Sequence, residues 1–374
     1  MSYHGRFEQA KQPKQPGKKK GLKIFLIVIA VILVLLLILA GAAYLYLQSK
    51  LKKMNIIELP KDTYAYTEPT DEVTRPPETG AAETTEATTE ATVPKMTADD
   101  IINILVVGQA ARAGEESYMA DSTMLVSINT YTKEINCMSV LRDSLVKLPD
   151  YKGHQCGRAK FTVCYNLGHL WGDTAGAMEM TNICLKDNFG VEVDYDVEVS
   201  FDGFIKMIDY IDGVDIDLTQ AEADYLNKDT LYVKRTIEPG VQRLQGMEAL
   251  SYARMRKAAG DSESDIKRTE RQRKVVEALL ERFRYMSLSK LNNWVDILMP
   301  MVTTTMTPTD VTKLAARVLP IFSELKIKGA TVPMEGWGDM VDIYENGEIH
   351  SVMRFDTAKE KKLIRAITEA EVSE

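Results

Sequence analysis

The stretch IINILVVG at residues 101–108 decides the fold class of this chain. A short apolar run that ends in glycine is typical of a strand buried on both faces. Two more such runs follow at residues 124–129 (MLVSIN) and 135–141 (INCMSVL), and helical patterns alternate with further strand candidates toward the C-terminus. The interleaving predicts an α/β protein, an α/β/α sandwich around a central, mostly buried mixed sheet.

The remaining elements follow from apolar periodicity and from capping residues. Helices are expected at about residues 160–168, 174–189, 201–211, 246–257, 264–285, 309–325 and 357–371. Further strands are expected at residues 213–218, 326–333 and 340–344. Gly246 opens one of the two helices that matter most below, and Ser264 or Asp265 caps the other.

A continuous apolar stretch precedes the predicted domain. Residues 24–47 contain no charge and reach roughly 36 Å as a helix, enough to cross a hydrocarbon core of about 30 Å. Gly41-Ala42-Ala43 is similar to a signal-peptide cleavage site, but the apolar run continues through Leu47, which favours an uncleaved anchor. We therefore predict one transmembrane helix at residues 24–48.

The distribution of basic residues predicts the orientation of this helix in the membrane. Residues 1–23 hold seven lysines and arginines against Glu8, and they outnumber Lys50, Lys52 and Lys53 beyond the span. This basic head is predicted to stay in the cytoplasm. The protein is thus expected in the cell membrane as a single-pass protein, with its main domain extracytoplasmic.

Two segments follow the span. Residues 49–98 include a tract of Thr, Glu, Pro and Ala. This tract buries too little apolar surface to offset the conformational entropy lost on ordering, so a flexible acidic stalk is predicted. Residues 99–374 form the extracytoplasmic domain. Its Cys137, Cys156, Cys164 and Cys184 form either disulfides or buried free thiols.

Composition narrows the classes of function. The 374 residues are 45% hydrophobic and 27% charged, as in a chain that buries a core. The net charge is −8, and because residues 1–23 carry +6, the rest carries −14. A negatively charged domain repels the phosphate backbone of a nucleic acid, so no nucleic-acid partner is predicted. No Walker loop, HExxH or GxSxG motif occurs either.

Arginines supply the chemistry candidates. They lie after a predicted strand, at the end of one helix and on the next helix, and with them occur an aspartate and a glutamine. These residues are Arg142, Asp143, Arg254, Arg256, Arg268, Arg271 and Gln272. Guanidinium groups bind phosphate oxygens bidentately, so the set indicates an anionic, phosphate-bearing ligand, and the alternative is a solvated charged face.

Helix geometry adds a condition to this hypothesis. Arg254 and Arg256 are about 200° apart on an ideal helix, so both reach one site only if the helix ends between them. Residues 265, 268 and 272 share a face of the next helix, with 271 alongside. Asp121, before a predicted strand, is the candidate ligand for Mg²⁺, which one or two carboxylates and substrate phosphates commonly hold.

The ordered set of motifs resembles the LytR–CpsA–Psr family of cell-envelope proteins. The resemblance covers residues 99–285 well and the rest loosely, and the preceding span and stalk also fit. The matching segments are ILVVG (104–108), DSTMLVSIN (121–129), SVLRDS (139–144), Lys160-Phe161-Thr162, FDGFIKMIDYIDGVDIDL (201–218), LQGMEALSYARMR (244–256) and DIKRTERQ (265–272).

This resemblance implies a phosphotransferase that attaches a glycopolymer from a polyprenyl-pyrophosphate carrier to peptidoglycan. It implies Mg²⁺ (or Mn²⁺) as cofactor, with Asp121 as metal ligand, and an apolar tunnel for the lipid. The implied catalytic residues are Arg142, Asp143, Arg268 and Arg271. The implied pyrophosphate ligands are Arg142, Arg254, Arg256, Arg268, Arg271 and Gln272. The implied partners are the polyprenyl-linked glycopolymer, peptidoglycan and membrane lipid.

Two positions depart from the family pattern. Ala110 stands where the family usually has an aspartate after the first strand, and Met119 stands where it has an arginine. A carboxylate that helps to hold the metal and one guanidinium are therefore missing. This leaves an alternative function, a catalytically weakened member that binds polyprenyl-linked substrates or partner enzymes without turnover.

Overall fold

The computed structural model describes residues 53–60, 96–109, 120–256, 265–287, 299–334, 338–345 and 348–369, with a few isolated residues between them. Within these ranges, no helix has the combination of length and apolar character that crossing a bilayer requires. The predicted basic head and transmembrane helix, residues 1–23 and 24–48, lie outside the described residues.

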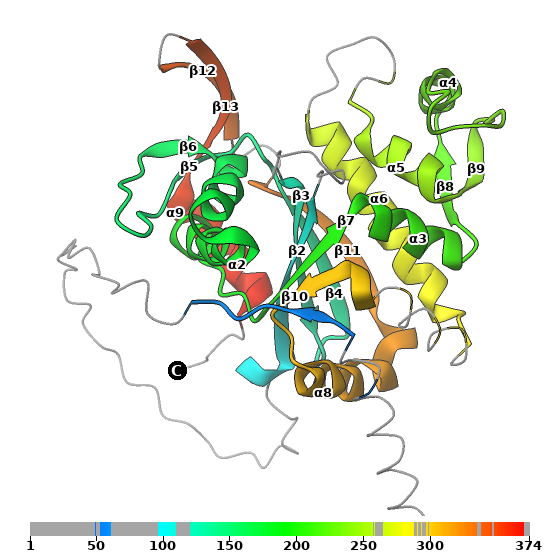
Figure 1. The fold of residues 1–374 in the computed structure, drawn as a ribbon, viewed down its shortest axis with the longest axis horizontal. Helices are drawn as coiled ribbons and strands as arrows, with labels where there is room; N and C mark the ends of the chain where they lie inside the picture. Colours follow the sequence, from blue (N-terminus) through cyan, green and yellow to red (C-terminus); the bar gives the residue numbers. More distant parts are fainter. Residues whose placement is uncertain are drawn as a thin grey trace, which may run out of the picture. The chain divides into compact units, whose positions relative to one another are not determined.

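A mixed sheet of seven strands forms the centre of the described domain (Figure 1). In spatial order its strands are β1 (Asn55–Ile56), β10 (Val302–Thr304), β7 (Tyr195–Ser200), β2 (Ile101–Gln109), β3 (Ala120–Asn129), β4 (Glu134–Val140) and β11 (Lys326–Val332). Strand β2 runs parallel to β7 and antiparallel to β3, and β4 runs parallel to β11. The predicted α/β fold with a central mixed sheet is therefore confirmed.

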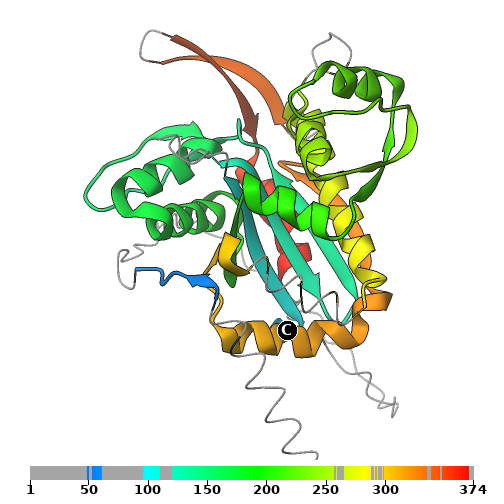
Figure 2. The same ribbon diagram turned by 45° about the vertical axis from the view of Figure 1, so that its right-hand side comes forward.

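Helices cover both faces of this sheet (Figures 1 and 2). Successive side chains of β2 point to opposite faces of the sheet, because side chains along a strand alternate with a period of two residues. Leu105 and Val107 pack under α2 (Phe161–Phe189) and α9 (Thr357–Thr368). Ile104 and Val106 pack under α6 (Asp265–Arg284) and α8 (Pro308–Val318).

A second lobe adjoins the sheet on the side of α6 (Figure 2). Its elements are α3 (Phe201–Tyr210), β8 (Val214–Leu218), α4 (Gln220–Lys228), β9 (Gly240–Leu244) and α5 (Gly246–Arg254). Strands β8 and β9 form an antiparallel pair, and their apolar residues build a core of their own with the three helices. Helix α6 completes this core through Val275 and Leu279, so it belongs to both layers.

Helix α2 is a pair of helical segments joined by a kink. Gly172 and Asp173 have non-helical backbone angles, which confirms the two separate helices predicted there. The two segments come into backbone contact, because a Cβ added to Gly168 would lie 2.5 Å from the carbonyl oxygen of Gly176. Glycine is required at this crossing since any side chain would separate the segments.

Two further hairpins flank the sheet. Strands β5 (Leu145–Lys147) and β6 (Arg158–Lys160) pair beside α2, and β12 (Gly338–Glu345) pairs with β13 (Glu348–Phe355). The longer hairpin is attached at its base to the loop after β4, because the Met353 N–H donates to the Asp143 carbonyl at 2.8 Å. Short 3₁₀ turns complete the chain at Ala98–Asp100, Met299–Met301 and Leu319–Glu324.

Several predicted boundaries are wrong. Residues 55–59 were assigned to the stalk, but β1 pairs with β10, and Ile57 and Leu59 pack on the main core. The apolar run NIIEL explains this, because the open edge of β10 offers backbone partners and the core takes the side chains. The helix expected at 309–325 ends at Val318 and continues as a 3₁₀ turn that contains Pro320, which has no N–H to donate.

The four cysteines are free thiols in the described structure. Cys137, Cys164 and Cys184 are buried, and burial raises the pKa of Cys137 to about 12. Burial also raises the pKa of Cys164 well above its ordinary value, and its thiol donates to the Met180 carbonyl at 3.1 Å across the α2 crossing. These thiols therefore act as small apolar core groups.

Candidate functional site

A polar cavity of about 480 Å³ lies where α5 and α6 meet α4 and the segment after it. The described residues that line it carry three guanidinium groups, one carboxylate, two phenols, a hydroxyl and an amide. They are Tyr225, Asp229, Tyr232, Ser251, Arg254, Arg256, Arg268 and Gln272. The structure thus brings four predicted pyrophosphate ligands, the three arginines and Gln272, into one cavity.

The end of α5 brings Arg254 and Arg256 together. The helix ends at Arg254, and Met255 is its C-cap with an extended backbone (φ −60°, ψ 122°). The change of direction at Met255 lets two side chains that an ideal helix would separate line the same cavity. The condition derived from the sequence is met, and the reason is the position of the helix end.

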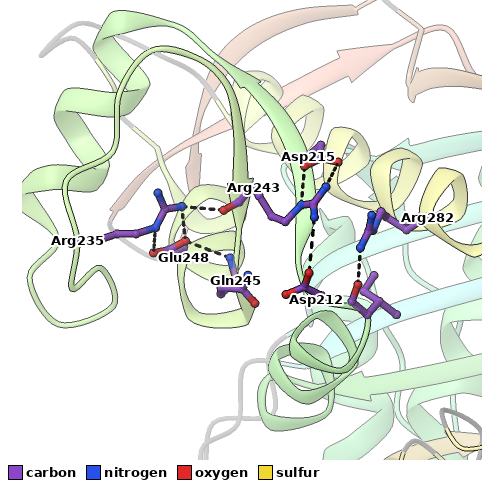
Figure 3. Close-up of polar contacts among 8 residues, drawn as sticks. Asp212, Asp215, Arg235, Arg243, Gln245, Glu248 and Arg282 are labelled. Atoms are coloured by element: carbon purple, nitrogen blue, oxygen red, sulfur yellow. Dashed lines mark hydrogen bonds and ion pairs between the residues drawn. The ribbon is translucent and has the colours of Figure 1, made fainter. Parts of the chain in front are cut away.

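A network of ion pairs fixes the start of α5 (Figure 3). Arg235 donates to both carboxylate oxygens of Glu248 at 2.9 Å and to the carbonyl of Arg243 at 2.7 Å. The Gln245 N–H donates to the same carboxylate at 3.1 Å, which caps the helix. Arg243 in turn donates to both oxygens of Asp215 on β8, at 2.9 and 3.0 Å. The network ties the hairpin β8–β9 to the helix that carries the first two arginines.

Aromatic rings orient Arg254. Its guanidinium carbon lies 5.2 Å from the ring centre of Phe201 and 5.7 Å from that of Tyr232. One guanidinium nitrogen donates to the Tyr232 hydroxyl at 2.9 Å. Cation–π attraction and this hydrogen bond hold a long side chain that is otherwise exposed. Arg254 is therefore positioned before any ligand binds.

Helix α6 presents its two predicted arginines to different surroundings. Arg268 and Gln272, one turn apart, line the cavity, and Arg268 is only 4% exposed. Arg271 instead forms a buried ion pair with Glu222 of α4, with Nε 2.8 Å from Oε1, and donates to the Met255 carbonyl at 3.2 Å. Arg271 thus joins α4, α5 and α6 beside the cavity, and it is not among the described lining residues.

The ion pair with Arg271 changes the pKa of the Glu222 carboxyl group. Burial by itself raises its pKa, but hydrogen bonds from Thr219 and Arg271, together with the Arg271 charge, outweigh burial and lower the pKa of Glu222. The pair is therefore ionised at neutral pH. Its role is to hold the wall of the cavity in place.

Arg142 and Asp143 lie at the carboxyl end of β4, in the loop that the sequence predicted. The Lys160 ammonium lies 2.8 Å from Asp143 Oδ1, and Arg142 Nε lies 3.8 Å from the same oxygen. The first N–H groups of α2 hold the loop, since Thr162 N–H donates to the Arg142 carbonyl at 3.1 Å. Neither loop residue is among the described lining of the cavity, and Lys160 is a cation that the sequence reasoning missed.

The predicted metal ligand is described only as a position in a strand. Asp121 lies in β3 directly after Ala120, but its side chain is outside the described part, as are Ala110 and Met119. Among the described residues, no group of three His, Cys, Asp or Glu side chains could hold a metal ion. The polar cavity, with three guanidinium groups and the single carboxylate of Asp229, suits an anion and does not fit a divalent cation.

An apolar cavity of about 240 Å³ adjoins the polar one. It lies between the ends of β2, β3 and β7 and the helices α3, α5 and α6, and most of its lining is aliphatic or aromatic. Its described lining residues include Val107, Met124, Val199, Phe204, Met207, Leu250, Val275 and Leu279. Arg254 and Gln272 line both cavities, so the apolar space meets the polar one at these two residues.

Half of the residues that line the polar cavity were not predicted from the sequence. Tyr225, Asp229 and Tyr232 come from α4 and the segment after it, and Ser251 comes from the middle of α5. No motif marks these positions. Tyrosines at this spacing suggest only a packed helix, and an aspartate at the end of a helix suggests a turn.

Comparison with known proteins gives the family. A model of the LytR_cpsA_psr family matches residues 72–362. The polyisoprenyl-teichoic acid–peptidoglycan teichoic acid transferase TagU of Oceanobacillus iheyensis is 28% identical over 246 residues, which are 65% of this chain and 69% of that protein. The regulatory protein MsrR of Staphylococcus aureus is 31% identical over 252 residues, 67% of this chain and 69% of the other.

Solved structures agree in fold. The Bacillus subtilis protein YwtF (TagT) with bound octaprenyl pyrophosphate lipid aligns with a TM-score of 0.52 at 20% identity, covering 74% of this chain and 94% of that one. Protein gbs0355 from Streptococcus agalactiae aligns with a TM-score of 0.58 at 22% identity, covering 72% and 89%. The ordered motifs, the mixed sheet and these matches agree, and the chain belongs to the LytR_cpsA_psr family.

Proposed function

We propose that this protein is a membrane-anchored phosphotransferase that attaches a glycopolymer from a polyprenyl-pyrophosphate carrier to peptidoglycan. One observation carries the proposal: a polar cavity with three arginines meets an apolar cavity at Arg254 and Gln272. A lipid diphosphate has the matching sequence of groups, an apolar chain followed at once by two phosphates. The names of TagU and of the TagT complex support the same class of ligand.

The arginines would bind the diphosphate. Arg254 and Arg256 at the end of α5 and Arg268 on α6 converge on one cavity, where they can form charge-assisted hydrogen bonds to phosphate oxygens. Asp143, which Lys160 contacts, would position Arg142, the predicted ligand on the neighbouring loop. Arg271 would act through Glu222 by holding the cavity wall.

The proposed reaction is a phosphoryl transfer. A hydroxyl of peptidoglycan attacks the phosphorus that bears the glycopolymer, a new oxygen–phosphorus bond forms, and the bond to the bridging oxygen breaks. The proton of the acceptor hydroxyl passes to solvent, and polyprenyl phosphate leaves with the electron pair. Catalysis of such a step rests on positioning and on stabilisation of charge on the phosphate oxygens, which guanidinium groups supply.

The proposal includes a divalent metal ion, for which Asp121 is the one proposed protein ligand. Mg²⁺ or Mn²⁺, held by Asp121 and by the diphosphate oxygens, would neutralise negative charge on the phosphates. The described lining offers no alternative set of ligands. Every other contribution described above comes from the arginines and their supporting partners.

The cellular setting of the proposal rests on the sequence. The basic head and the apolar span predicted at residues 1–48 would place the domain outside the cytoplasmic membrane. Ala110 and Met119 favour the alternative, binding without turnover, because they replace a metal-holding carboxylate and a guanidinium. The same experiment separates the two.

The test uses the full chain in detergent micelles with a polyprenyl-pyrophosphate saccharide and a peptidoglycan oligomer. Release of polyprenyl phosphate is followed with and without Mg²⁺, and binding of the donor is measured separately. Arg256→Ala and Arg268→Ala remove one cavity arginine each, and Lys274→Ala, an exposed residue of α6, is the matched control.

Wild-type protein is expected to release the carrier in the presence of Mg²⁺. Each arginine variant should bind the donor about 10- to 100-fold more weakly, since a hydrogen bond to a charged group contributes about 1.5–3 kcal/mol. The control variant should match the wild type. Tight binding without release would favour the alternative function, and no binding at all would overturn both.

A further inference from the structure

The wall of the polar cavity that α4 and its following segment supply carries no cationic side chain that would bind a diphosphate. At about 480 Å³ the cavity is comparable with pockets that enclose a whole small molecule, more than a diphosphate needs. Tyr225, Asp229 and Tyr232 form this wall together with Ser251 of α5. We call these four residues the α4 wall.

The Asp229 carboxylate is held in a fixed orientation. Its residue is the C-cap of α4, and its carbonyl accepts from the N–H groups of Tyr232 and Val233 at 3.1 and 2.9 Å. Ser251, which is 3% exposed, donates its hydroxyl to Asp229 Oδ2 at 2.5 Å. Backbone and side chain are both fixed, so the half-buried carboxylate presents its remaining lone pairs to the cavity.

Charge indicates what this carboxylate faces. A carboxylate repels phosphate, so Asp229 opposes a diphosphate placed beside it and favours groups that donate hydrogen bonds. The hydroxyls of a sugar are such donors. Three arginines and one carboxylate in a single cavity therefore suit a ligand with an anionic part and a neutral, hydroxyl-rich part.

The tyrosines complete this environment. Tyr225 and Tyr232 are half-buried and pack against the lobe core, so their rings are fixed and present both an apolar body and a polar tip. The Tyr232 hydroxyl accepts from Arg254, which places the α4 wall directly beside the arginine at the junction of the two cavities. A group attached to a diphosphate at that junction would contact this wall first.

We infer that the α4 wall is a saccharide subsite that recognises the sugar joined to the carrier diphosphate and selects a neutral, hydroxyl-rich pyranose over an anionic one. Asp229 accepts hydrogen bonds from the sugar hydroxyls and repels a uronic acid at the same position. Ser251 positions the carboxylate, and the tyrosine rings cover the sugar. This inference rests on the proposed binding of a lipid diphosphate.

The experiment compares three ligands on the full chain in detergent micelles. They are polyprenyl diphosphate, its conjugate with N-acetylglucosamine and its conjugate with glucuronic acid, each measured by equilibrium binding. Asp229→Asn keeps an oxygen that accepts from Ser251 but removes the charge. Asp224→Asn is the matched control, because Asp224 is an exposed residue of α4 that pairs with Gln220 at 2.9 Å and does not line the cavity.

The wild type is expected to bind the neutral conjugate at least tenfold more tightly than the anionic one. Asp229→Asn should reduce this ratio about tenfold, partly by binding the anionic conjugate more tightly than the wild type does. Such a gain cannot arise from a loss of folding. Asp224→Asn should keep the wild-type ratio, and Ser251→Ala should lower it by releasing the carboxylate.

The failures are distinguishable. If the wild type binds none of the three ligands, the proposed function itself is overturned. If it binds all three with equal affinity, or if Asp229→Asn leaves the ratio unchanged, lipid diphosphate binding stands and the saccharide subsite is overturned.

Discussion

Arg268 and Arg271 are three residues apart on one helix, yet their guanidinium groups have different roles. Arg268 lines the polar cavity, whereas Arg271 lies 2.8 Å from Glu222, a residue 49 positions earlier in the chain. The sequence indicates that both are near a site, but it cannot show that α4 supplies a buried carboxylate to one of them. Only the tertiary contact distinguishes the arginine that lines the cavity from the one that pairs with a buried carboxylate.

Arg271→Ala is expected to lower the free energy of unfolding by about 3 kcal/mol at pH 7, because it leaves the Glu222 carboxylate buried without its partner. Urea denaturation measures the change, with Lys274→Ala as the exposed control on the same helix. The folded-state pKa of Glu222 is lowered, so the stabilisation is present above its ordinary value of 4.5 and is lost in more acidic solution. A loss of stability independent of pH would contradict this explanation.

Asp196 gives the opposite dependence on pH. It is 1% exposed on β7, accepts from Asn182 at 3.2 Å and from Thr305 at 3.3 Å, and burial raises its pKa from 3.8 to about 6. A raised carboxyl pKa stabilises the folded state below 3.8, and this contribution is lost as the pH rises through 6. The interval corresponds to about 3 kcal/mol.

We therefore expect Asp196→Asn to gain stability relative to the wild type between pH 4 and pH 7, by about 2 kcal/mol. Urea denaturation of both proteins at the two pH values gives the difference directly, because the other titrating groups are common to both. A difference that stays constant over this range would show that Asp196 does not titrate as its burial indicates.

At the scale of elements, the sequence predicted what apolar periodicity encodes. The runs at β2, β3 and β4 and the helices that follow them appear where they were expected, because burial of one face or both leaves a clear pattern. Strand β7 was missed. Its sequence YDVEVS reads as half polar, but Asp196 and Glu198 are buried, where Asn182 and the Tyr165 hydroxyl donate to them.

The residues of the candidate site also divide into those that local sequence predicts and those that it does not. The arginines at a helix end, and Arg268 and Gln272 one turn apart on the next helix, were predictable, since local geometry sets their positions. The residues of the α4 wall were not, because their place in the cavity depends on how α4 packs against α5. Ser251 and Asp229 are 22 residues apart, and nothing in either local sequence marks the contact.

Gly246 controls how the start of α5 packs against α3. A Cβ at this position would lie 2.3 Å from the carbonyl oxygen of Ile205, so α5 starts in backbone contact with α3. Gly246→Ala should cost about 1–3 kcal/mol of stability, as overpacking does, and should weaken donor binding because Arg254 ends the displaced helix. Thermal melting and donor binding test this, with Gly157→Ala as control, since no atom lies within 4 Å of a Cβ there. Unchanged melting would contradict the contact.

At the scale of the whole described domain, α6 joins two cores. Val276 and Leu280 pack on the sheet, while Val275 and Leu279 pack in the lobe. The apolar cavity lies at this seam, with lining from the sheet, from α3 and α5 and from α6 itself. The apolar cavity therefore comes from how the two layers meet, and no single element contains it.

Because the apolar and polar cavities meet at Arg254 and Gln272, the spent carrier of the proposed reaction would keep the contacts of its polyprenyl chain and of its remaining phosphate. Each buried methylene contributes about 0.8 kcal/mol, and the polyprenyl chain is unchanged by the reaction. We expect polyprenyl phosphate to act as a competitive product inhibitor, in steady-state assays, far more strongly than inorganic phosphate; equal inhibition by the two would contradict this. Turnover would then be limited by the residence time of the used lipid, and so by how quickly the surrounding membrane takes it back.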